Sequence, residues 1–404
     1  MCKIMKMTRK ILLCIAKVVA TLLLLLLLAV CATSVTPIYR FAEPTPFSGD
    51  DIFNPYASFD AAKGWKRANF HTHTKVDGIF NECDYSPAET QAMLERFGYD
   101  VVTFSNHNEL TKHPSDETLQ VNLYEHGYNL FKFHKLVFGA DKVLYFDHLL
   151  PLLTSQKQFQ IDMLGEESDI IVLNHPLRTH TMSKQTMQSL TGYQIIELDS
   201  GHSTENEYWD EALSAGQYSF AMANDDLHYP DRSHCIARRC NFLQMPSESY
   251  EDIRACLLGG CYYSMRIPDY GRGDWSVKYE RNRRLPYIKN IGLQNRDIFI
   301  SLSQPADSVK VTGEHHTTLA ICYNTDSLGY TLKASDPYAR FTAYFADGEV
   351  VWSNPFARYD AEHNASPLVV REHRVDILLT ILFNLLLAAL CGGCIALLYY
   401  IYKR

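Results

Sequence analysis

Short apolar runs alternate with helix-like segments over residues 65–266, between two long apolar chain ends. Runs such as 65–70, 99–104 and 169–173 predict buried strands, because they are short and are bounded by polar residues or glycine. Between several of these runs the apolar residues follow helical spacing, and the Ser-Pro-Ala-Glu sequence at 86–89 is a capping box with proline at the first helical position. Alternation of strand and helix favours the α/β class with a mainly parallel sheet.

The expected elements of this region follow one another in a regular order. Strands are expected at residues 65–70, 99–104, 135–139, 169–173, 193–198, 218–223 and 261–266. Helices are expected at residues 86–97, 116–134, 156–165, 208–215 and 249–258. Parallel α/β barrels carry their sites at the rim where the strands end. The polar residues that follow these strands are therefore expected to meet there.

From about residue 286 the pattern changes to short alternating runs separated by turn residues. Strands are expected at 298–302, 309–312, 317–323, 330–333, 341–345 and 350–353. This spacing is typical of a small β-sandwich subdomain. The predicted organisation is a signal peptide or signal anchor (1–40), a linker (41–64), an α/β domain (65–285), a β-sandwich subdomain (286–360), a juxtamembrane linker (361–375) and a transmembrane helix (376–402).

Both chain ends contain an apolar segment long enough to span a bilayer. Residues 11–31 follow several lysines and arginines, which fits a cleaved signal peptide or an uncleaved signal anchor equally, and a lipoprotein site at Cys31 less well. Residues 377–402 carry no charge and end in tyrosines before Lys403-Arg404, the pattern of a transmembrane helix with a cytoplasmic basic tail. We expect a protein of the cell membrane with residues 41–370 on the periplasmic or extracellular side.

The charge balance excludes one class of partner. The formal net charge is −8, and the first 40 residues contain basic but no acidic residues, so the middle of the chain is more acidic than the total indicates. A strongly acidic domain argues against a nucleic-acid partner, whose phosphates require a basic surface. Six cysteines lie in the middle region, and one or two disulfides or simple buried thiols are favoured over a metal ribbon.

Histidine and aspartate residues recur at or just beyond the predicted strand ends. His71 and His73, at positions i and i+2 of an extended chain, point to the same face, so both can reach one ion. The full set of such donors is His71, His73, Asp77, His107, Asp141, His148, His175, Asp226 and His228. Mixed imidazole and carboxylate ligation suits Mn, Zn or Fe, and the set is large enough for two or three divalent ions.

In chain order these residues resemble the motifs of the polymerase and histidinol phosphatase (PHP) family of metal-dependent hydrolases. The matching motifs are His71-Thr72-His73 with Asp77-Gly78 and Ser86-Pro87-Ala88-Glu89, Ser105-Asn106-His107, Gly139-Ala140-Asp141, His148-Leu149-Leu150, Asn174-His175-Pro176 and Asp226-Leu227-His228. They cover about residues 65–265. The resemblance implies a distorted PHP-type (β/α) barrel in which the donors listed above bind up to three metal ions. Asp141 stands where the family usually has glutamate.

The resemblance also implies a hydrolase acting on a small-molecule substrate, with phosphate ester hydrolysis as the leading reaction. Two ions would share a hydroxide and direct it at phosphorus, with Asp226 and His228 as catalytic residues. Arg178 is the expected cation for a phosphate oxygen, or else an ordinary surface arginine. Hydrolysis of a carboxyl ester, amide or carbamate is the second hypothesis, because the C-terminal β-region resembles the carbaryl-hydrolase-like branch of the family. A non-catalytic, metal-binding ectodomain that binds a partner is the third.

Overall fold

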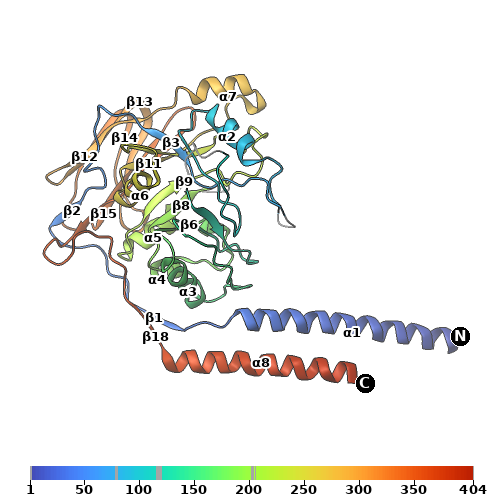
Figure 1. Cartoon of the computed structure of the whole chain (residues 1–404). Helices are drawn as coiled ribbons and strands as arrows, with labels where there is room; N and C mark the ends of the chain where they lie inside the picture. The colour runs from blue at the N-terminus through green and yellow to red at the C-terminus, as the bar shows by residue number, and fades with distance from the viewer. Residues whose placement is uncertain (1, 78–80, 115–120, 202–203, 205, 404) are drawn as a thin grey trace.

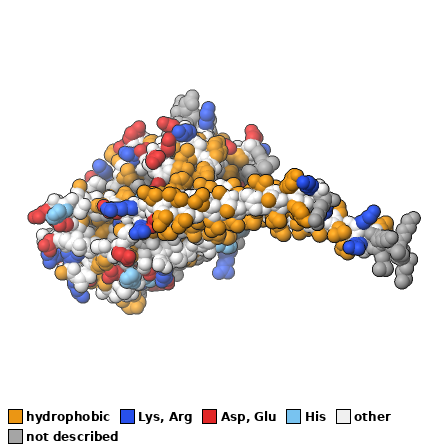
Figure 2. Space-filling view, turned by 90° about the horizontal axis from the view of Figure 1, so that it is seen from below, with side chains coloured by type: hydrophobic (Ala, Val, Ile, Leu, Met, Phe, Trp, Pro, Cys, Tyr) orange, Lys and Arg blue, Asp and Glu red, His pale blue; other side chains and the backbone are white. Residues whose placement is uncertain are grey.

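Two long terminal helices project from a mixed α/β part (Figure 1). The computed structural model describes residues 2–77, 81–114, 121–201, 204 and 206–403. Helices α1 (Cys2–Thr33) and α8 (Ile377–Lys403) lie side by side, and Asn384 Nδ2 donates a hydrogen bond to the Thr36 carbonyl at 3.0 Å. Their segments Met7–Thr33 and Ile377–Lys403 are long and apolar enough to cross a membrane. Figure 2 shows the side chains of the helices as an apolar band that extends beyond the α/β part.

A short pair of strands joins the two helices at their base. Strand β1 (Tyr39–Phe41) pairs antiparallel with β18 (His373–Val375). Arg40 Nε also donates to the Asp376 carboxylate at 2.6 Å. Because β1 follows α1 and β18 precedes α8, both helices leave the α/β part at the same place, and the two termini lie at the same end (Figure 1).

A ring of strands forms the centre of the α/β part. Its members are β3 (Lys66–Asn69), β4 (Val101–Val102), β5 (Leu123–His126), β6 (Lys135–Phe138), β7 (Ile170–Leu173), β8 (Ile195–Asp199), β9 (Phe220–Ala223) and β10 (Arg239–Leu243). Strands β5 to β9 form one sheet in that order, and β10, β3 and β4 are neighbours in a second sheet. A bridge between His107 and Glu125 links the chain after β4 to β5. Asn241 in β10 exchanges two hydrogen bonds with Ala223 of β9, at 2.9 and 3.0 Å, which closes the ring.

Helices cover the outside of this ring. They are α2 (Pro87–Glu95), α3 (Thr154–Gly165), α4 (Lys184–Ser189), α5 (Asn206–Ser214), α6 (Tyr250–Gly259) and the short 3-10 helix η1 (Pro176–Arg178). Helix α2 starts with the predicted capping box, since the Glu89 carboxylate accepts from the Ser86 N–H at 2.8 Å. One apolar cluster joins the ring strands to α3 and α5, with Leu173, Ile161 and Trp209 fully buried.

The C-terminal strands extend the second sheet, and the predicted separate β-sandwich is wrong in this respect. From β10 the sheet continues through β11 (Tyr262–Arg266), β16 (Val350–Ser353), β15 (Tyr338–Tyr344), β13 (Asp297–Thr312) and β12 (Ile288–Gln294). Attached to this path are β14 (Thr318–Thr331), β17 (Phe356–Tyr359) and β2 (Asp51–Phe53), and nearby lie α7 (Trp275–Asn282), η2 (Tyr270–Gly273) and η3 (Glu314–His316). The predicted linker 41–64 therefore contributes a strand, β2, which pairs with β17.

Strands β13 and β14 replace four of the short strands that the sequence predicts. The segments 298–302 and 309–312 both fall in β13, whose pairing with β14 shifts register between Ser301 and Ala306. Such an irregularity accommodates Pro305 without ending the strand. In the same way most of 317–323 and the first half of 330–333 fall in one long strand, β14, which ends at Thr331.

The helix predicted over 116–134 is wrong for residues 121–134, which contain β5 and a loop. All four residues of β5 are buried, and the strand pairs antiparallel with β6. A strand buried on both faces lacks the alternation that identifies strands, so a short run of this kind does not distinguish strand from helix. Residues 115–120 lie outside the described part of the chain.

The sheets are mixed, which corrects the prediction of a mainly parallel arrangement. Among the described strands, β3–β4, β7–β8 and β8–β9 are parallel pairs, whereas β5–β6 and β6–β7 are antiparallel. After β6, residues 139–147 cross back to the opposite end of the sheet, where His126 Nε2 donates to the Phe146 carbonyl at 3.0 Å. Helix α3 begins from there, so the C-terminal end of β6 points away from the C-terminal ends of its neighbours.

The cysteines of the middle region are thiols. Of the described cysteine side chains none forms a disulfide, and Cys83, Cys240, Cys256 and Cys261 are buried. Burial raises the pKa of the Cys240 thiol to about 11. Of the two structural alternatives left open by the sequence, the structure favours buried thiols.

Candidate metal centre

Histidine, aspartate and glutamate side chains meet at the end of the ring where the parallel strands finish. His71 and His73 follow β3, His107 follows β4, Glu125 lies in β5, His175 follows β7, and Asp226 and His228 follow β9. His134 immediately precedes β6, whose reversed direction brings its N-terminal end to the same rim. The site is therefore assembled from the ends of several strands of the ring, and β3 and β9 each place two of its side chains.

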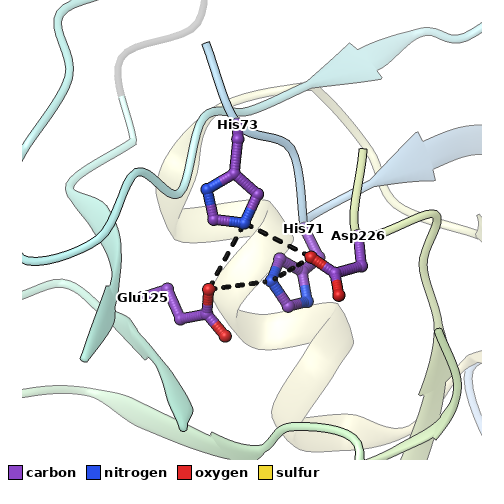
Figure 3. A group of neighbouring side chains, drawn as sticks. All are labelled: His71, His73, Glu125 and Asp226. Atoms are coloured by element: carbon purple, nitrogen blue, oxygen red, sulfur yellow. Dashed lines mark ion pairs between the residues drawn. The ribbon is translucent and has the colours of Figure 1, made fainter. Parts of the chain in front are cut away.

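Four donor atoms form the centre of this group (Figure 3). His71 Nε2 lies 3.2 Å from Glu125 Oε2 and 3.3 Å from Asp226 Oδ1. His73 Nε2 lies 3.3 Å from each of the same two oxygens. The four side chains point toward one another, and their donor atoms lie within 4.8 Å of one another. Two imidazole nitrogens and two carboxylate oxygens in this arrangement suit a divalent ion such as zinc.

Glu125 connects the central set to a second group of imidazoles. Its Oε2 also lies 3.2 Å from His107 Nε2, while Oε1 lies 3.2 Å from His134 Nδ1 and 3.4 Å from His175 Nε2. A carboxylate that turns one oxygen toward each of two imidazole groups is arranged to bridge two ions. These residues provide the donors for a binuclear centre.

A third group lies on the solvent side of His73. Its members are His73, Glu82 and His228. Glu82 Oε2 lies 3.4 Å from His228 Nε2 and 3.2 Å from His107 Nε2, and the His228 ring stacks on that of His73 at a centroid distance of 4.2 Å. Hydrogen bonds from His107 and His228 lower the pKa of Glu82. This group offers donors for a further ion at the mouth of the site.

Glu197 in β8 orients His71 from behind. Its Oε1 lies 2.8 Å from His71 Nδ1 and accepts a hydrogen bond from Asn224 Nδ2 at 3.2 Å, and its Oε2 accepts from the His175 backbone N–H at 3.1 Å. Because an ionised carboxylate can only accept, His71 carries a proton on Nδ1 and presents Nε2 to Glu125 and Asp226. A carboxylate that fixes an imidazole in this way is the usual support of a metal-ligating histidine.

The nitrogens of the central set face carboxylate oxygens at 3.2–3.3 Å without forming hydrogen bonds to them. Within the described residues, His71 Nε2 and His73 Nε2 are buried and form no hydrogen bond, whereas buried polar atoms normally have a partner. Burial lowers the pKa of His71, but three neighbouring carboxylates outweigh burial and raise it well above its ordinary value. For His73, burial and the neighbouring His228 lower the pKa. Divalent cations would satisfy the unpaired nitrogens and the carboxylates together, so the residues present fit a metal centre.

Two of the donors stand on strained backbone. Asp226 has φ +48° and His175 has φ +28°, values that residues other than glycine seldom adopt. The backbone next to Asp226 is held by Leu227, whose N–H donates to the His71 carbonyl at 3.1 Å and whose carbonyl accepts from the His73 N–H at 2.9 Å. The contacts that maintain the strain are therefore the same contacts that align Asp226 with the two histidines.

Arg178 lies at the mouth of the site. It belongs to η1, and its Nη1 donates to Asp226 Oδ2 at 2.5 Å while the side chain stays 23% exposed. The two oxygens of Asp226 thus have different tasks, since Oδ1 faces His71 and His73 and Oδ2 faces Arg178. A guanidinium in this position can meet an anionic group of a substrate.

The structure brings together six of the nine donors that the sequence predicts. These are His71, His73, His107, His175, Asp226 and His228. Asp77, Asp141 and His148 belong to none of the donor groups found among the described residues. Asp141 is exposed beyond the C-terminal end of β6, which is reversed, and so lies at the other end of the ring. His148 turns away, because its Nδ1 donates to the Thr33 carbonyl at the end of α1 at 2.5 Å. Asp77 is exposed. The structure does not support these three as ligands, and the ligand role of the other six stays a prediction.

Four residues of the site are absent from the sequence-based prediction: Glu82, Glu125, His134 and Glu197. Glu125 and His134 fall in the segment predicted as a helix over 116–134, where no strand end is expected. Glu125 lies among the donors, whereas Asp141, the carboxylate that the sequence offered in this part of the chain, lies outside them. Glu197 lies inside the predicted strand 193–198, and an acidic residue within an otherwise apolar strand is a signal that identifies it, since acids are rarely buried without a partner. Glu82 lies in a polar loop with no distinguishing pattern.

The chain is a mixed α/β protein with a C-terminal β-region, and its buried histidine, glutamate and aspartate groups are consistent with a metal site. The chain matches a solved structure over 78% of its length and 99% of the other chain, with 15% sequence identity and a TM-score of 0.36. That structure is a two-domain protein from Bacteroides vulgatus containing a predicted PHP-like metal-dependent phosphoesterase. No protein-family model and no curated protein matches the chain. At this TM-score and identity the chemistry of the site rests on its own side chains.

Proposed function

We propose that this protein is a membrane-anchored, metal-dependent phosphoesterase. The observation that carries the proposal is the placement of Glu125 and Asp226, two buried carboxylates that each lie between the Nε2 atoms of His71 and His73. Buried charges are costly unless cations neutralise them, and among the described residues every direct ion pair of Glu125 is with a histidine, not with lysine or arginine. A centre of divalent ions supplies the missing positive charge.

The proposed ligands form two groups that share Glu125. His71, His73 and Asp226 belong to the first group, and His107, His134 and His175 to the second, with Glu82 and His228 as a further pair on the solvent side. Divalent ions such as Mn, Zn or Fe, when bound there, supply Lewis-acid stabilisation of negative charge and make water more acidic. Hydrolysis of a phosphate ester needs both effects.

The remaining task of the site is to bind and orient the substrate. Arg178, paired with the outer oxygen of Asp226, binds a phosphate oxygen at the mouth. His228 donates from Nδ1 to the Asp226 carbonyl at 2.8 Å, which leaves its Nε2 directed toward Glu82. This nitrogen is within reach of solvent and can exchange a proton with a group bound at the mouth. Burial of His71 and Glu125 keeps bulk water away from the charges and strengthens their effect.

The terminal helices support attachment to a membrane. Both are long and apolar enough to cross a bilayer, and their surface leucines are exposed, with Leu22 and Leu23 at 61% and 62%. Basic residues flank the outer end of each helix, and such residues favour the cytoplasmic side. In this proposal the catalytic part therefore lies on the non-cytoplasmic side.

Glu125→Gln tests the proposal, with Asp141→Asn as the matched control. Glutamine keeps the shape of Glu125 but removes the charge shared by the two imidazole groups. We expect purified wild-type protein to carry divalent ions and to hydrolyse an aryl phosphate, and Glu125→Gln to lose bound metal and to be slower by about 100-fold or more. Asp141→Asn should keep both, because Asp141 is exposed at the other end of the ring. Elemental analysis and a colorimetric assay measure the two effects.

The same proteins separate the alternative functions. If the wild type hydrolyses carboxyl esters or carbamates but no phosphate ester, the second hypothesis is correct and the phosphoesterase proposal is wrong. Bound metal without turnover of any ester would support the third hypothesis, a non-catalytic, metal-binding ectodomain. Equal metal content and rate in Glu125→Gln and the wild type would contradict the assignment of the centre itself.

A further inference from the structure

An exposed apolar surface lies beside the mouth of the metal site. It comes from the loops 128–132 and 145–153, and we call it the apolar rim. Its exposed members are Leu130 (60%), Tyr145 (74%), Phe146 (40%), Leu152 (53%) and Leu153 (37%). The Leu130 N–H donates to the Leu149 carbonyl at 3.1 Å, so the two loops form one surface. Exposed apolar side chains that gather on adjoining loops mark a surface that another apolar body covers.

The apolar rim is attached to the end of α1. His148 Nδ1 donates to the Thr33 carbonyl at 2.5 Å, and the Leu149 N–H donates to Thr33 Oγ1 at 3.3 Å. Thr33 is the last residue of the segment long enough to cross a membrane. These contacts place the rim at the level where α1 would leave a bilayer. Tyr145 and Leu152 are three and four residues from His148, a reach of at most about 14 Å. Tyrosine and leucine are residues that enter the interfacial layer of membranes.

On its other side the apolar rim is attached to the metal site. The Tyr128 hydroxyl donates to the His107 carbonyl at 2.8 Å, and Asp147 Oδ2 accepts from the Tyr128 N–H at 2.9 Å. His107 belongs to the second donor group, so the loops that carry the rim also support that group. Leu177, 47% exposed, directly precedes Arg178 at the mouth. A bilayer in contact with the rim would lie against the entrance of the site.

We propose that the apolar rim enters the non-cytoplasmic surface of the membrane, and that the substrate is a membrane lipid with a phosphate ester in its headgroup. The substrate part rests on the proposed function. In the reaction the oxygen of water forms a bond to phosphorus, the ester P–O bond breaks, and the proton passes to the oxygen of the leaving alcohol. The acyl chains stay in the bilayer beside the rim while the headgroup reaches Arg178 and the donors.

Contact between the rim and lipid is measured without turnover. Full-length Tyr145→Trp is reconstituted in vesicles that contain brominated phosphatidylcholine, and the wild-type fluorescence is subtracted. Tyr323→Trp is the matched control, because Tyr323 is also exposed, at 67%, but lies on β14, which Figure 1 shows away from the terminal helices. We expect bromine to quench the introduced tryptophan in the first variant and not in the second. Quenching in neither variant, or equal quenching in both, overturns the contact.

The substrate class is tested with a triple variant, Leu130→Ser with Tyr145→Ser and Leu152→Ser, in the same vesicles. The wild type should hydrolyse phosphatidic acid or phosphatidylglycerol, and the variant should lose about tenfold or more of this rate while its rate on a soluble aryl phosphate is unchanged. A wild type that hydrolyses the aryl phosphate but neither lipid overturns the lipid substrate, and so does a variant whose two rates fall together or stay equal to wild type. A wild type inactive on every phosphate ester refutes the proposed function and the substrate with it, whereas the quenching result still decides on the rim.

Discussion

Replacing Glu197 with glutamine tests how far metal affinity depends on a residue that is placed behind the ligands. Glu197 Oε1 lies 2.8 Å from His71 Nδ1 and also accepts from Asn224, while Oε2 accepts from the His175 N–H at 3.1 Å. All three contacts bring a donor to a carboxylate oxygen. Glutamine has the same shape but only one acceptor oxygen, so its N–H₂ group must face at least one of these donors.

Either orientation of the glutamine amide breaks a buried contact. If its nitrogen faces His71, the imidazole loses the acceptor that fixes its proton on Nδ1. If the nitrogen faces the His175 N–H, that buried donor stays unsatisfied. The loss of a hydrogen bond to a charged group, or of the only partner of a buried donor, costs about 1.5–3 kcal/mol. At about 1.4 kcal/mol per factor of ten, the ion at His71 should bind roughly 10- to 100-fold more weakly.

Metal affinity is measured by competition between the purified full-length protein and a fluorescent chelator at constant pH. Glu211→Gln is the matched control, because Glu211 is also a nearly buried glutamate but lies on α5, where it accepts from Gln188 and contacts His315. Its substitution should leave metal affinity unchanged. An affinity of Glu197→Gln within about twofold of wild type would refute the reasoning that this carboxylate holds His71 in its metal-binding form.

Three further predictions follow from charges and topology. The raised pKa of His71 means that below this pKa a proton competes with the ion, so metal affinity should rise with pH, and an affinity independent of pH would contradict this. Asp210→Asn should lower the free energy of unfolding by about 3–5 kcal/mol, because it leaves Arg340 buried without its charged partner, whereas Asp347→Asn in an exposed pair should change denaturant unfolding little. Protease added outside spheroplasts should digest residues 41–370 and spare the C-terminal tail, and complete protection would place the α/β part inside.

Much of the strand and helix pattern was predictable because it is local. Each strand predicted between residues 65 and 266 overlaps a strand of the structure. Each helix predicted there overlaps a helix of the structure, except the helix predicted at 116–134. His71 and His73 were predictable for the same reason, since alternation along one strand places both on one face. Their partner Asp226 was found because it directly follows the predicted strand 218–223.

The direction of strands was not predictable from local pattern, and the errors in the candidate site follow from it. A carboxylate after the strand 135–139 belongs to the site only if this strand runs parallel to its neighbours. It runs antiparallel, so Asp141 lies at the far end of the ring and His134, at the start of the strand, lies at the site. Glu125 is identified as a site residue only from the pairing of β5 with β6, because the sequence around it does not distinguish a buried strand from a helix.

The reversal of β6 also explains why His148 contacts the terminal helix α1 and not the donor groups. After β6 ends at the far end of the ring, residues 139–147 must return along the sheet before α3 can begin, and this return brings His148 to the end of α1. His148 belongs to none of the donor groups found among the described residues, and its Nδ1 donates to the Thr33 carbonyl instead. The hydrogen bond to Thr33 is present, so the loop serves to attach the helix to the rim of the site. One reversed strand therefore accounts for the absence of Asp141 from the donor groups, the presence of His134 among them, and the contact between the end of α1 and the loop that carries His148.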